Sequence, residues 1–254
     1  MSNIRVITLD LWQTLIIDRP ELGRNRMGYR IKSTFDALKE AEENFTEEQI
    51  TNGYISCYYE CRDIREKGKD ISFSDQIRLF IRCVDKGLLN RINKDTFVKI
   101  EVKYANSFYE SPPKLIGGVK EMLATLKDHG YSLGLISNTA MTPGSIFRSY
   151  MESLGILHYF DHLTFSDEVL LAKPSPDIFF YSLGRLGSSP DEAVHVGDHL
   201  LLDVWGAQRV GMKTVWVENA ENKSEEIVSD ATILSVTDLP QVLDSLGSPT
   251  CIGN

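Results

Sequence analysis

The sequence predicts an α/β fold: a doubly wound, mostly parallel sheet with an all-helical segment inserted after the first strand. Two observations support this prediction. From about residue 112 onward, short apolar runs alternate with helical patterns, as in strands joined by right-handed helical crossovers. Between residues 17 and 111, helical spacing is almost continuous and strand signals are few.

Apolar runs bounded by polar or turn residues indicate the strands. We expect them at residues 6–9, 131–136, 193–196, 213–217 and 231–234. Helices are expected between them, from Val119 to a stop at Gly130, from Pro176 onward, and from 204 to 210 before Gly211. In such sheets ligands bind beyond the carboxyl ends of the strands, so a site is expected among the residues that follow each strand.

Helical spacing within the insert indicates three helices, near residues 35–42, 50–61 and 77–84. Cys57 and Cys61 share one helical face. Because they have no neighbouring His or Cys ligands, we expect core or near-core thiols rather than metal ligands. Tyr54, Tyr58 and Tyr59 are expected in the core of the insert.

The composition limits the class of protein. Of the 254 residues, 42% are apolar and 25% are charged, which is typical of globular proteins. No apolar run approaches the roughly 18 residues that span a bilayer, and the cysteines are too few for a disulfide scaffold. We therefore expect a cytoplasmic protein, not a membrane protein. A net charge of −9 disfavours general binding to nucleic acid.

Polar residues follow the predicted strands at four places. They are Asp10 with Thr14, Ser137 with Asn138, Lys173, and Asp198 with Asp203. Their chemistry suits one site, because a carboxylate attacks an electrophile, a lysine holds anions, and a hydroxyl hydrogen-bonds a transferring group. Asp10 and Asp198 are candidates to share a hard divalent ion, for which oxygen ligands and size suit Mg²⁺.

Four segments, in this order, resemble the motifs of the haloacid dehalogenase-like hydrolase superfamily, in its C1-capped subclass. They are residues 10–15 (DLWQTL), 135–138 (LISN), 172–179 (AKPSPDIF) and 197–203 (GDHLLLD). The resemblance implies a Rossmann-like core domain made of residues 1–16 and 112–254. It also implies that residues 17–111 form a helical C1-type cap, which closes over the site and excludes water.

The same resemblance implies roles for the motif residues. Asp10 is implied as the nucleophile, with Mg²⁺ held by Asp10, the backbone carbonyl of Trp12 and Asp198. Ser137 and Lys173 are implied as catalytic residues that bind the transferring phosphoryl group, and Lys173 also keeps Asp10 ionised. Substrate-binding roles are expected for Thr14 and Asn138, and a supporting role for Asp203.

Position 12 departs from the pattern of the family's phosphatases. They carry an aspartate there, which protonates the leaving oxygen and later activates water, whereas this chain has Trp12. An indole offers only an N–H donor, and loss of general acid–base help typically costs ~10²- to 10⁴-fold in rate. Either another group supplies the proton, for which His199 is a candidate, or the leaving group needs none, as in acyl and aryl phosphates.

The primary hypothesis is a Mg²⁺-dependent phosphatase that acts on a small phosphorylated metabolite. The main alternative is a 2-haloacid dehalogenase acting on a halogenated substrate, since these enzymes also lack the second aspartate and need no metal. Their fourth motif begins with a neutral pair, whereas the carboxylate of Asp198 would repel Asp10 unless a cation lay between them. A third hypothesis is a catalytically weak member that binds a phosphometabolite or a protein partner.

Four arginines crowd the segment that enters the insert, namely Arg19, Arg24, Arg26 and Arg30. A solvated helix face is one interpretation of this charge run. The other is that one or two of them line the cap side of the pocket and bind an anionic substrate. Arg24 and Arg26 are the predicted substrate-binding pair.

Overall fold

The computed structural model describes residues 4–219 and 226–247, and it contains a six-stranded sheet in the order β5-β4-β1-β6-β7-β8. Every neighbouring pair in this sheet is parallel. The strands are β1 (Val6–Leu9), β4 (Ser132–Ser137), β5 (His162–Phe165), β6 (Ala193–Gly197), β7 (Lys213–Val217) and β8 (Ala231–Ile233). The predicted strands are confirmed, while the edge strand β5 was not predicted.

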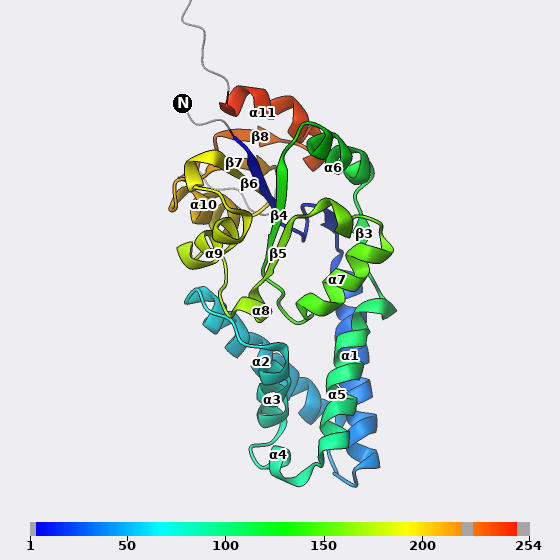
Figure 1. Ribbon diagram of the computed structural model, residues 1–254. Helices are drawn as coiled ribbons and strands as arrows, with labels where there is room; N and C mark the ends of the chain where they lie inside the picture. Colours follow the sequence, from blue (N-terminus) through cyan, green and yellow to red (C-terminus); the bar gives the residue numbers. More distant parts are fainter. Residues whose placement is uncertain (1–3, 220–225, 248–254) are drawn as a thin grey trace, which may run out of the picture.

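Helices cover both faces of the sheet, with α9 and α10 on one side and α6, α7 and α11 on the other (Figure 1). Their bounds are α6 (Val119–Asp128), α7 (Gly144–Ser153), α9 (Pro176–Leu186), α10 (Gly206–Gln208) and α11 (Leu239–Gly247). The short helix α8 (Ser166–Val169) follows β5, and a π-helical turn, Leu200–Trp205, precedes α10. This arrangement confirms the predicted doubly wound fold.

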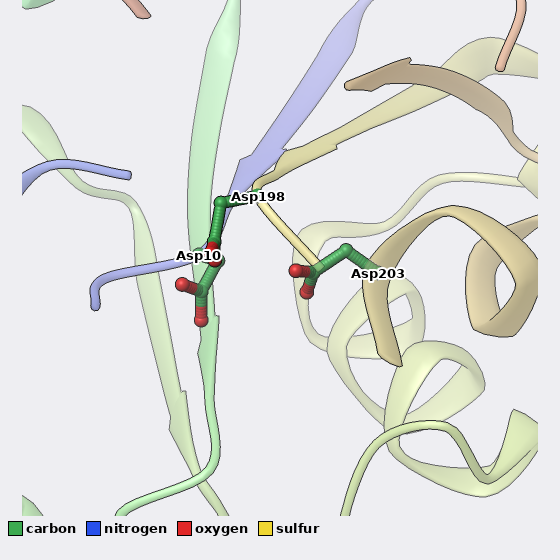
Figure 2. A group of neighbouring side chains, drawn as sticks. All are labelled: Asp10, Asp198 and Asp203. Carbon is green, nitrogen blue, oxygen red and sulfur yellow. The ribbon is translucent and has the colours of Figure 1, made fainter. Parts of the chain in front are cut away.

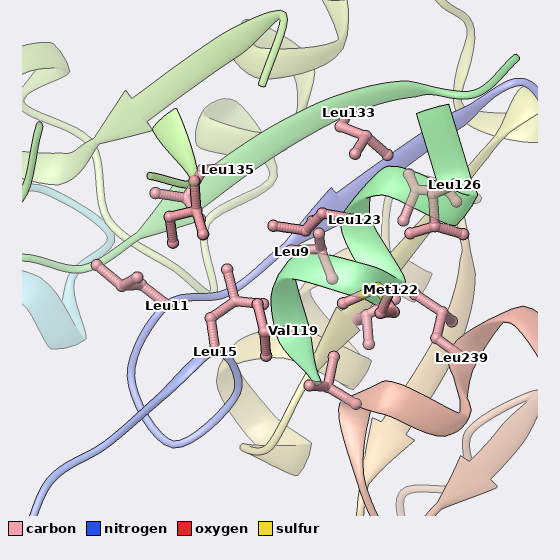
Figure 3. Close-up of a cluster of buried hydrophobic side chains, with 14 of the residues drawn as sticks. Leu9, Leu11, Leu15, Val119, Met122, Leu123, Leu126, Leu133, Leu135 and Leu239 are labelled. Carbon is pink, nitrogen blue, oxygen red and sulfur yellow. The ribbon is translucent and has the colours of Figure 1, made fainter. Parts of the chain in front are cut away.

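The apolar strands account for this double cover, because successive side chains of a strand point to opposite faces. Leu9, Leu133 and Leu135 pack against α6 and its neighbours in one buried cluster (Figure 3). Val6 and Ile136 instead join a second cluster with residues of α9 and α10. Full burial of one such side chain stabilises the fold by roughly 1.5–3 kcal/mol, so both faces anchor the strands.

The segment between β1 and the rest of the sheet is helical, as predicted. It contains α1 (Pro20–Glu40), α2 (Glu47–Glu66), α3 (Phe73–Val84), α4 (Leu88–Arg91), α5 (Lys94–Asn106) and the 3₁₀ turn η1 (Ser107–Glu110). An antiparallel pair, β2 (Ile16–Ile17) with β3 (Lys114–Leu115), joins its two ends. Thr46 caps α2 with a capping box to Gln49, which explains why that helix begins where it does.

A hydrophobic cluster made of insert residues and Met141 lies among these helices, and α1 and α5 run side by side in the insert (Figure 1). Cys57 and Cys61 are fully buried there, which confirms the prediction of core thiols. Tyr54 is buried too, but Tyr58 and Tyr59 are 42% and 49% exposed, so the prediction was wrong for these two. The face of α2 that carries them borders a cavity instead of another helix.

None of the described helices is long and apolar enough to cross a membrane.

Candidate active site

Strand register brings the motif residues to one edge of the sheet. Leu9 of β1 lies beside Leu135 of β4 and Val196 of β6, so the residues that follow these positions meet at the carboxyl ends of the strands. The backbone N–H of Asp10 donates to the carbonyl of Val196 at 2.9 Å, which fixes its backbone at this edge. The chain then turns through Gln13, at a φ of 58°, and back into β2.

Lys173 is buried between two carboxylates. Its Nζ lies 2.6 Å from Oδ1 of Asp10 and 2.6 Å from Oδ1 of Asp203. Burial disfavours its charge, but the two carboxylates outweigh burial and raise the pKa of Lys173 above its ordinary value. The lysine is therefore held as a cation against the predicted nucleophile.

Asn138 holds the backbone of Lys173 on both sides. Its Oδ1 accepts from the N–H of Lys173 at 2.9 Å, and its Nδ2 donates to the carbonyl of Lys173 at 3.0 Å. The side chain predicted to bind substrate thus positions the lysine. These two hydrogen bonds hold the end of β4 and the loop of Lys173 at a fixed distance, although Asn138 and Lys173 are 35 positions apart in the sequence.

A buried chain of polar groups supports Asp203, and the sequence reasoning missed part of it. Nε2 of His195 lies 3.1 Å from Oδ1 of Asp203, and Nδ1 lies 2.8 Å from Oγ1 of Thr8. Burial lowers the pKa of His195, which favours the neutral ring. Burial would raise the pKa of Asp203, but Lys173 and His195 bring it below its ordinary value. The chain of contacts holds Asp203 ionised behind the lysine.

A signal for His195 was present but weak. A histidine inside a buried apolar run needs a polar partner, and Thr8 occupies the register-matched position on the adjacent strand. Only the pairing of β1 with β6 reveals that the two side chains meet.

Three buried carboxylates, Asp10, Asp198 and Asp203, converge at the sheet edge (Figure 2). Each offers an oxygen within 4.8 Å of the others. Asn219 donates to Oδ2 of Asp198 at 2.8 Å, and Trp216 Nε1 donates to its carbonyl at 2.8 Å. Burial, and to a smaller extent the nearby Asp203, raises the pKa of Asp198 above its ordinary value.

The charge and the ligand atoms of this cluster show whether a metal ion would fit there. The pKa of Asp10 is raised to about 7. Burial is the main cause, Lys173 opposes the rise, and the charges of Asp203 and Asp198 add to it. Among the described residues, the cation that contacts these carboxylates is Lys173, which lies against Asp10 and Asp203, and a divalent cation would offset further negative charge in the cluster. All-oxygen ligands suit a hard cation, so the residues present fit the predicted metal.

Two hydroxyls predicted to bind substrate are buried without partners. Oγ of Ser137, at the end of β4, makes no hydrogen bond with any described residue, and the same holds for Oγ1 of Thr14. A buried hydroxyl without a partner costs free energy, so a ligand that reaches Ser137 would relieve that cost. A cavity of about 290 Å³ lies nearby and is lined by Asp10, Lys173 and Asp198 among others.

Trp12 also lines this cavity, but its ring is packed among aromatic residues. Its centroid lies 5.4 Å from that of Phe147 and 6.5 Å from that of Phe108, both edge-to-face. The guanidinium of Arg26 lies 5.7 Å from the ring centroid. His199 lines the cavity as well, and its Nδ1 accepts from the N–H of Leu202 at 3.3 Å.

A sequence model of the family described as haloacid dehalogenase-like hydrolase matches residues 51–217, more than half of the chain. The chain belongs to this family. The predicted resemblance is thereby confirmed, and the protein is a hydrolase.

Relatives of the family resemble the chain over its whole length. A glyceraldehyde 3-phosphate phosphatase of Pyrococcus furiosus is 28% identical over 97% of this chain and 94% of its own. A HAD phosphatase structure from Thermococcus onnurineus, 24% identical, covers 94% of this chain and 98% of its own with a TM-score of 0.64. The structure of a 2-haloacid dehalogenase from Pseudomonas syringae pv. Tomato DC3000, 22% identical, covers 95% of this chain and 99% of its own with a TM-score of 0.69. The two structures share the fold.

The arginines of this HAD-like hydrolase do not form one solvated face. Arg26 is buried, forms an ion pair with Asp18 and donates to the carbonyl of Ser111 at 2.7 Å, so it ties together both ends of the insert. Arg24 is exposed and pairs with Glu21 at 3.3 Å. Arg30 is also buried. Arg24, Arg26 and Arg30 all line a second cavity, of about 780 Å³, which shares Trp12 with the first.

Proposed function

We propose that this chain is a Mg²⁺-dependent phosphatase that hydrolyses a small phosphorylated metabolite through an aspartyl-phosphate at Asp10. The observation that carries the proposal is the buried carboxylate cluster. Asp10 and Asp198 lie together with Asp203, and Lys173 contacts Asp10 and Asp203. Dehalogenation needs no metal, whereas phosphoryl transfer uses a cation at such a cluster of carboxylates.

Each residue then has a defined task. Lys173 favours the ionised form of Asp10 and orients it for attack on phosphorus, and Asp203 and Asn138 hold the lysine in place. The unpartnered hydroxyl of Ser137 would donate to a phosphoryl oxygen. Magnesium, when held by Asp10, Asp198 and the backbone carbonyl of Trp12, would neutralise charge on the phosphoryl group.

The relatives support the phosphatase reaction, since the full-length relative from Pyrococcus furiosus is named for a small phosphorylated substrate. We further propose that residues 17–111 act as the cap of the 1–16 and 112–254 core and exclude water during the reaction. Its separate hydrophobic cluster supports this division. A cytoplasmic location remains a prediction from cysteine usage.

Dehalogenation of a 2-haloacid is the second candidate, because Trp12 removes the carboxylate that a poor leaving group needs. Halide leaves without a proton. Chloride release from 2-chloropropionate in the presence of EDTA would establish this activity. Phosphate release that requires Mg²⁺, with no chloride release, would instead establish the phosphatase.

The first prediction is that Asp10→Asn abolishes phosphate release, because an amide oxygen is not a nucleophile at phosphorus. A residual rate below about 10⁻³ of the original is expected, in line with removal of other catalytic nucleophiles. Phosphate release from an aryl phosphate would be measured with Mg²⁺. Asp128→Asn, an exposed change at the end of α6, is the matched control and should keep full activity. Equal activity of Asp10→Asn and Asp128→Asn would refute the mechanism.

A further inference from the structure

A cavity of about 780 Å³ is lined by Trp12 and by residues of the insert. Four of its lining residues are aromatic, namely Trp12 and Tyr54, Tyr58 and Tyr59 of α2. Tyr58 and Tyr59 remain 42% and 49% exposed because they border this space. A cavity of this size and lining suits a flat apolar group better than a three-carbon chain.

This aromatic cavity adjoins the catalytic one. Trp12 lines both, and Asn138 of the catalytic cavity is followed directly by Thr139 of the aromatic cavity. A substrate with its phosphoryl group at Asp10 would therefore extend its leaving group past Trp12 into the aromatic cavity.

Arg30 supplies a buried positive charge at the same cavity. It is 3% exposed, and its guanidinium lies 4.6 Å from the ring centroid of Tyr104. Its hydrogen bonds go to hydroxyls only: Oγ of Ser107 at 2.7 Å, Oγ1 of Thr142 at 2.9 Å and Oη of Tyr54 at 3.3 Å. Within the described ranges, no carboxylate forms an ion pair with it.

Arg26 gives the contrast within the same helix, because it is equally buried but paired with Asp18. A buried charge without a counter-ion is costly, so such a group is usually paired. Among residues 4–219 and 226–247, no carboxylate pairs with Arg30, and a bound anionic ligand would supply the counter-ion.

We infer that the substrate is an aryl phosphate whose ring carries a second oxyanion, such as a carboxylate. The ring lies between Trp12 and the tyrosines of α2, and the oxyanion pairs with Arg30. This inference rests on the proposed phosphatase function and names its substrate class. It also accounts for Trp12, since a phenolate departs without the proton that an aspartate would supply.

The reaction balances without an added acid. A carboxylate oxygen of Asp10 bonds to phosphorus, and the bond from phosphorus to the aryl oxygen breaks, with the electron pair leaving on the phenolate. Water then hydrolyses the acyl phosphate, which returns the carboxylate of Asp10 and releases inorganic phosphate. The phenolate takes its proton from solvent.

The test compares three phosphates: 3-carboxyphenyl phosphate, phenyl phosphate and phosphoglycolate. The carboxylated ring is expected to exceed each of the others in kcat/KM by roughly tenfold or more, mainly through KM. Arg30→Gln should remove the preference for the carboxylated over the neutral ring, and Arg30→Lys should retain part of it. Arg82→Gln, an exposed change on α3, is the matched control and should keep the preference.

Equal kcat/KM for 3-carboxyphenyl and phenyl phosphate in the unaltered protein would overturn the inference, and so would a preference that survives Arg30→Gln. Faster hydrolysis of phosphoglycolate than of the carboxylated ring would also overturn it. The comparisons of 3-carboxyphenyl phosphate with phenyl phosphate and with phosphoglycolate use only the unaltered protein. They decide the matter even if Arg30→Gln, which loses contacts to Ser107 and Thr142, does not fold.

Failure of the proposed function gives a different result, namely no phosphate release from any of the three. In that case calorimetry with 3-carboxybenzylphosphonate, which cannot be hydrolysed, measures binding alone. Binding that weakens roughly tenfold in Arg30→Gln but not in Arg82→Gln would uphold the anion site. Equal binding to both variants, or no binding to the unaltered protein, would overturn it.

Discussion

Trp12 occupies the position where the family's phosphatases carry an acid–base aspartate, and its packing shows what the replacement does. The ring contacts Phe147 and Phe108 and lines two cavities. It therefore has a structural role at a position where a carboxylate would act chemically. The leaving group must depart with little help from this residue.

A second prediction follows for leaving groups. Rates of the unaltered protein should fall steeply as the leaving-group pKa rises, whereas Trp12→Asp should flatten this dependence by raising the rate on alkyl phosphates, up to ~10²-fold. Steady-state rates over a series of aryl and alkyl phosphates measure the slope. Trp12→Leu removes the ring without adding a carboxylate, and a flattened slope in that variant as well would show that acid–base help is not the cause.

A third prediction concerns pH and Mg²⁺. Burial raises the pKa of Asp10 to about 7, so the metal-free native state holds a proton that the unfolded chain releases near pH 4, roughly its ordinary value. The contribution of Asp10 to stability therefore falls as pH rises from about 4 to about 7. Because Mg²⁺ binds the ionised form, it should raise the melting temperature more at pH 8 than at pH 6. Equal shifts at both pH values would contradict this assignment.

At the scale of elements, the end of β6 fits closely against the turn that carries Asp203. A Cβ added to Gly197 would lie 2.6 Å from Cβ of Asp203, closer than real Cβ contacts. Asp203 in turn holds Lys173. The glycine thus allows a strand end and a helical turn to approach, and this approach positions the lysine.

The fourth prediction is that Gly197→Ala displaces Asp203 and lowers kcat by about tenfold or more, since small displacements of catalytic groups cost up to 10²-fold. Phosphate release and thermal unfolding measure the effect. Gly184→Ala on α9 is the matched control, because nothing lies within 4 Å of its added Cβ, and it should be neutral or stabilising. Unchanged kcat in Gly197→Ala would show that Asp203 does not position the lysine.

At the scale of the whole molecule, the helical insert is bonded to the loop before Lys173. The N–H of Asp70 donates to the carbonyl of Leu170 at 3.1 Å, and the N–H of Ala172 donates to the carbonyl of Gly68 at 3.1 Å. Oγ of Ser166 donates to Oδ2 of Asp70 at 2.6 Å. These three hydrogen bonds, here called the seam, join the insert to residues 166–172, which lead directly to Lys173.

The fifth prediction is that Asp70→Ala lowers the free energy of unfolding by about 1–3 kcal/mol, because it leaves buried donors without an acceptor. A double-mutant cycle with Ser166→Ala should give a coupling of about 0.5–3 kcal/mol. Denaturant unfolding measures both quantities. Additive effects of the two substitutions would show that the seam does not depend on this hydrogen bond.

Much of the fold was predictable because its signals are local. The strand near Val6 and the helix near Val119 follow from periodicity within a few residues. The edge strand β5 was missed because its four residues, HLTF, do not form the continuous apolar run seen in β1, and the strand is defined by pairing with β4. The prediction that Tyr58 and Tyr59 lie in the core was wrong. Helical spacing shows which residues share a face of a helix, but it does not show whether that face packs against another helix or borders a cavity.

The order of the elements and the residues at the strand ends follow from the sequence, since both depend on short-range pattern and on motif spacing. Three features follow from the tertiary structure alone: His195 meets Thr8 and Asp203, Trp12 packs on Phe147, and the buried Arg30 has no ion pair with a carboxylate of the described residues. These contacts depend on strand register and on packing between distant segments. Register and packing are set by the whole fold, and a local pattern does not specify them.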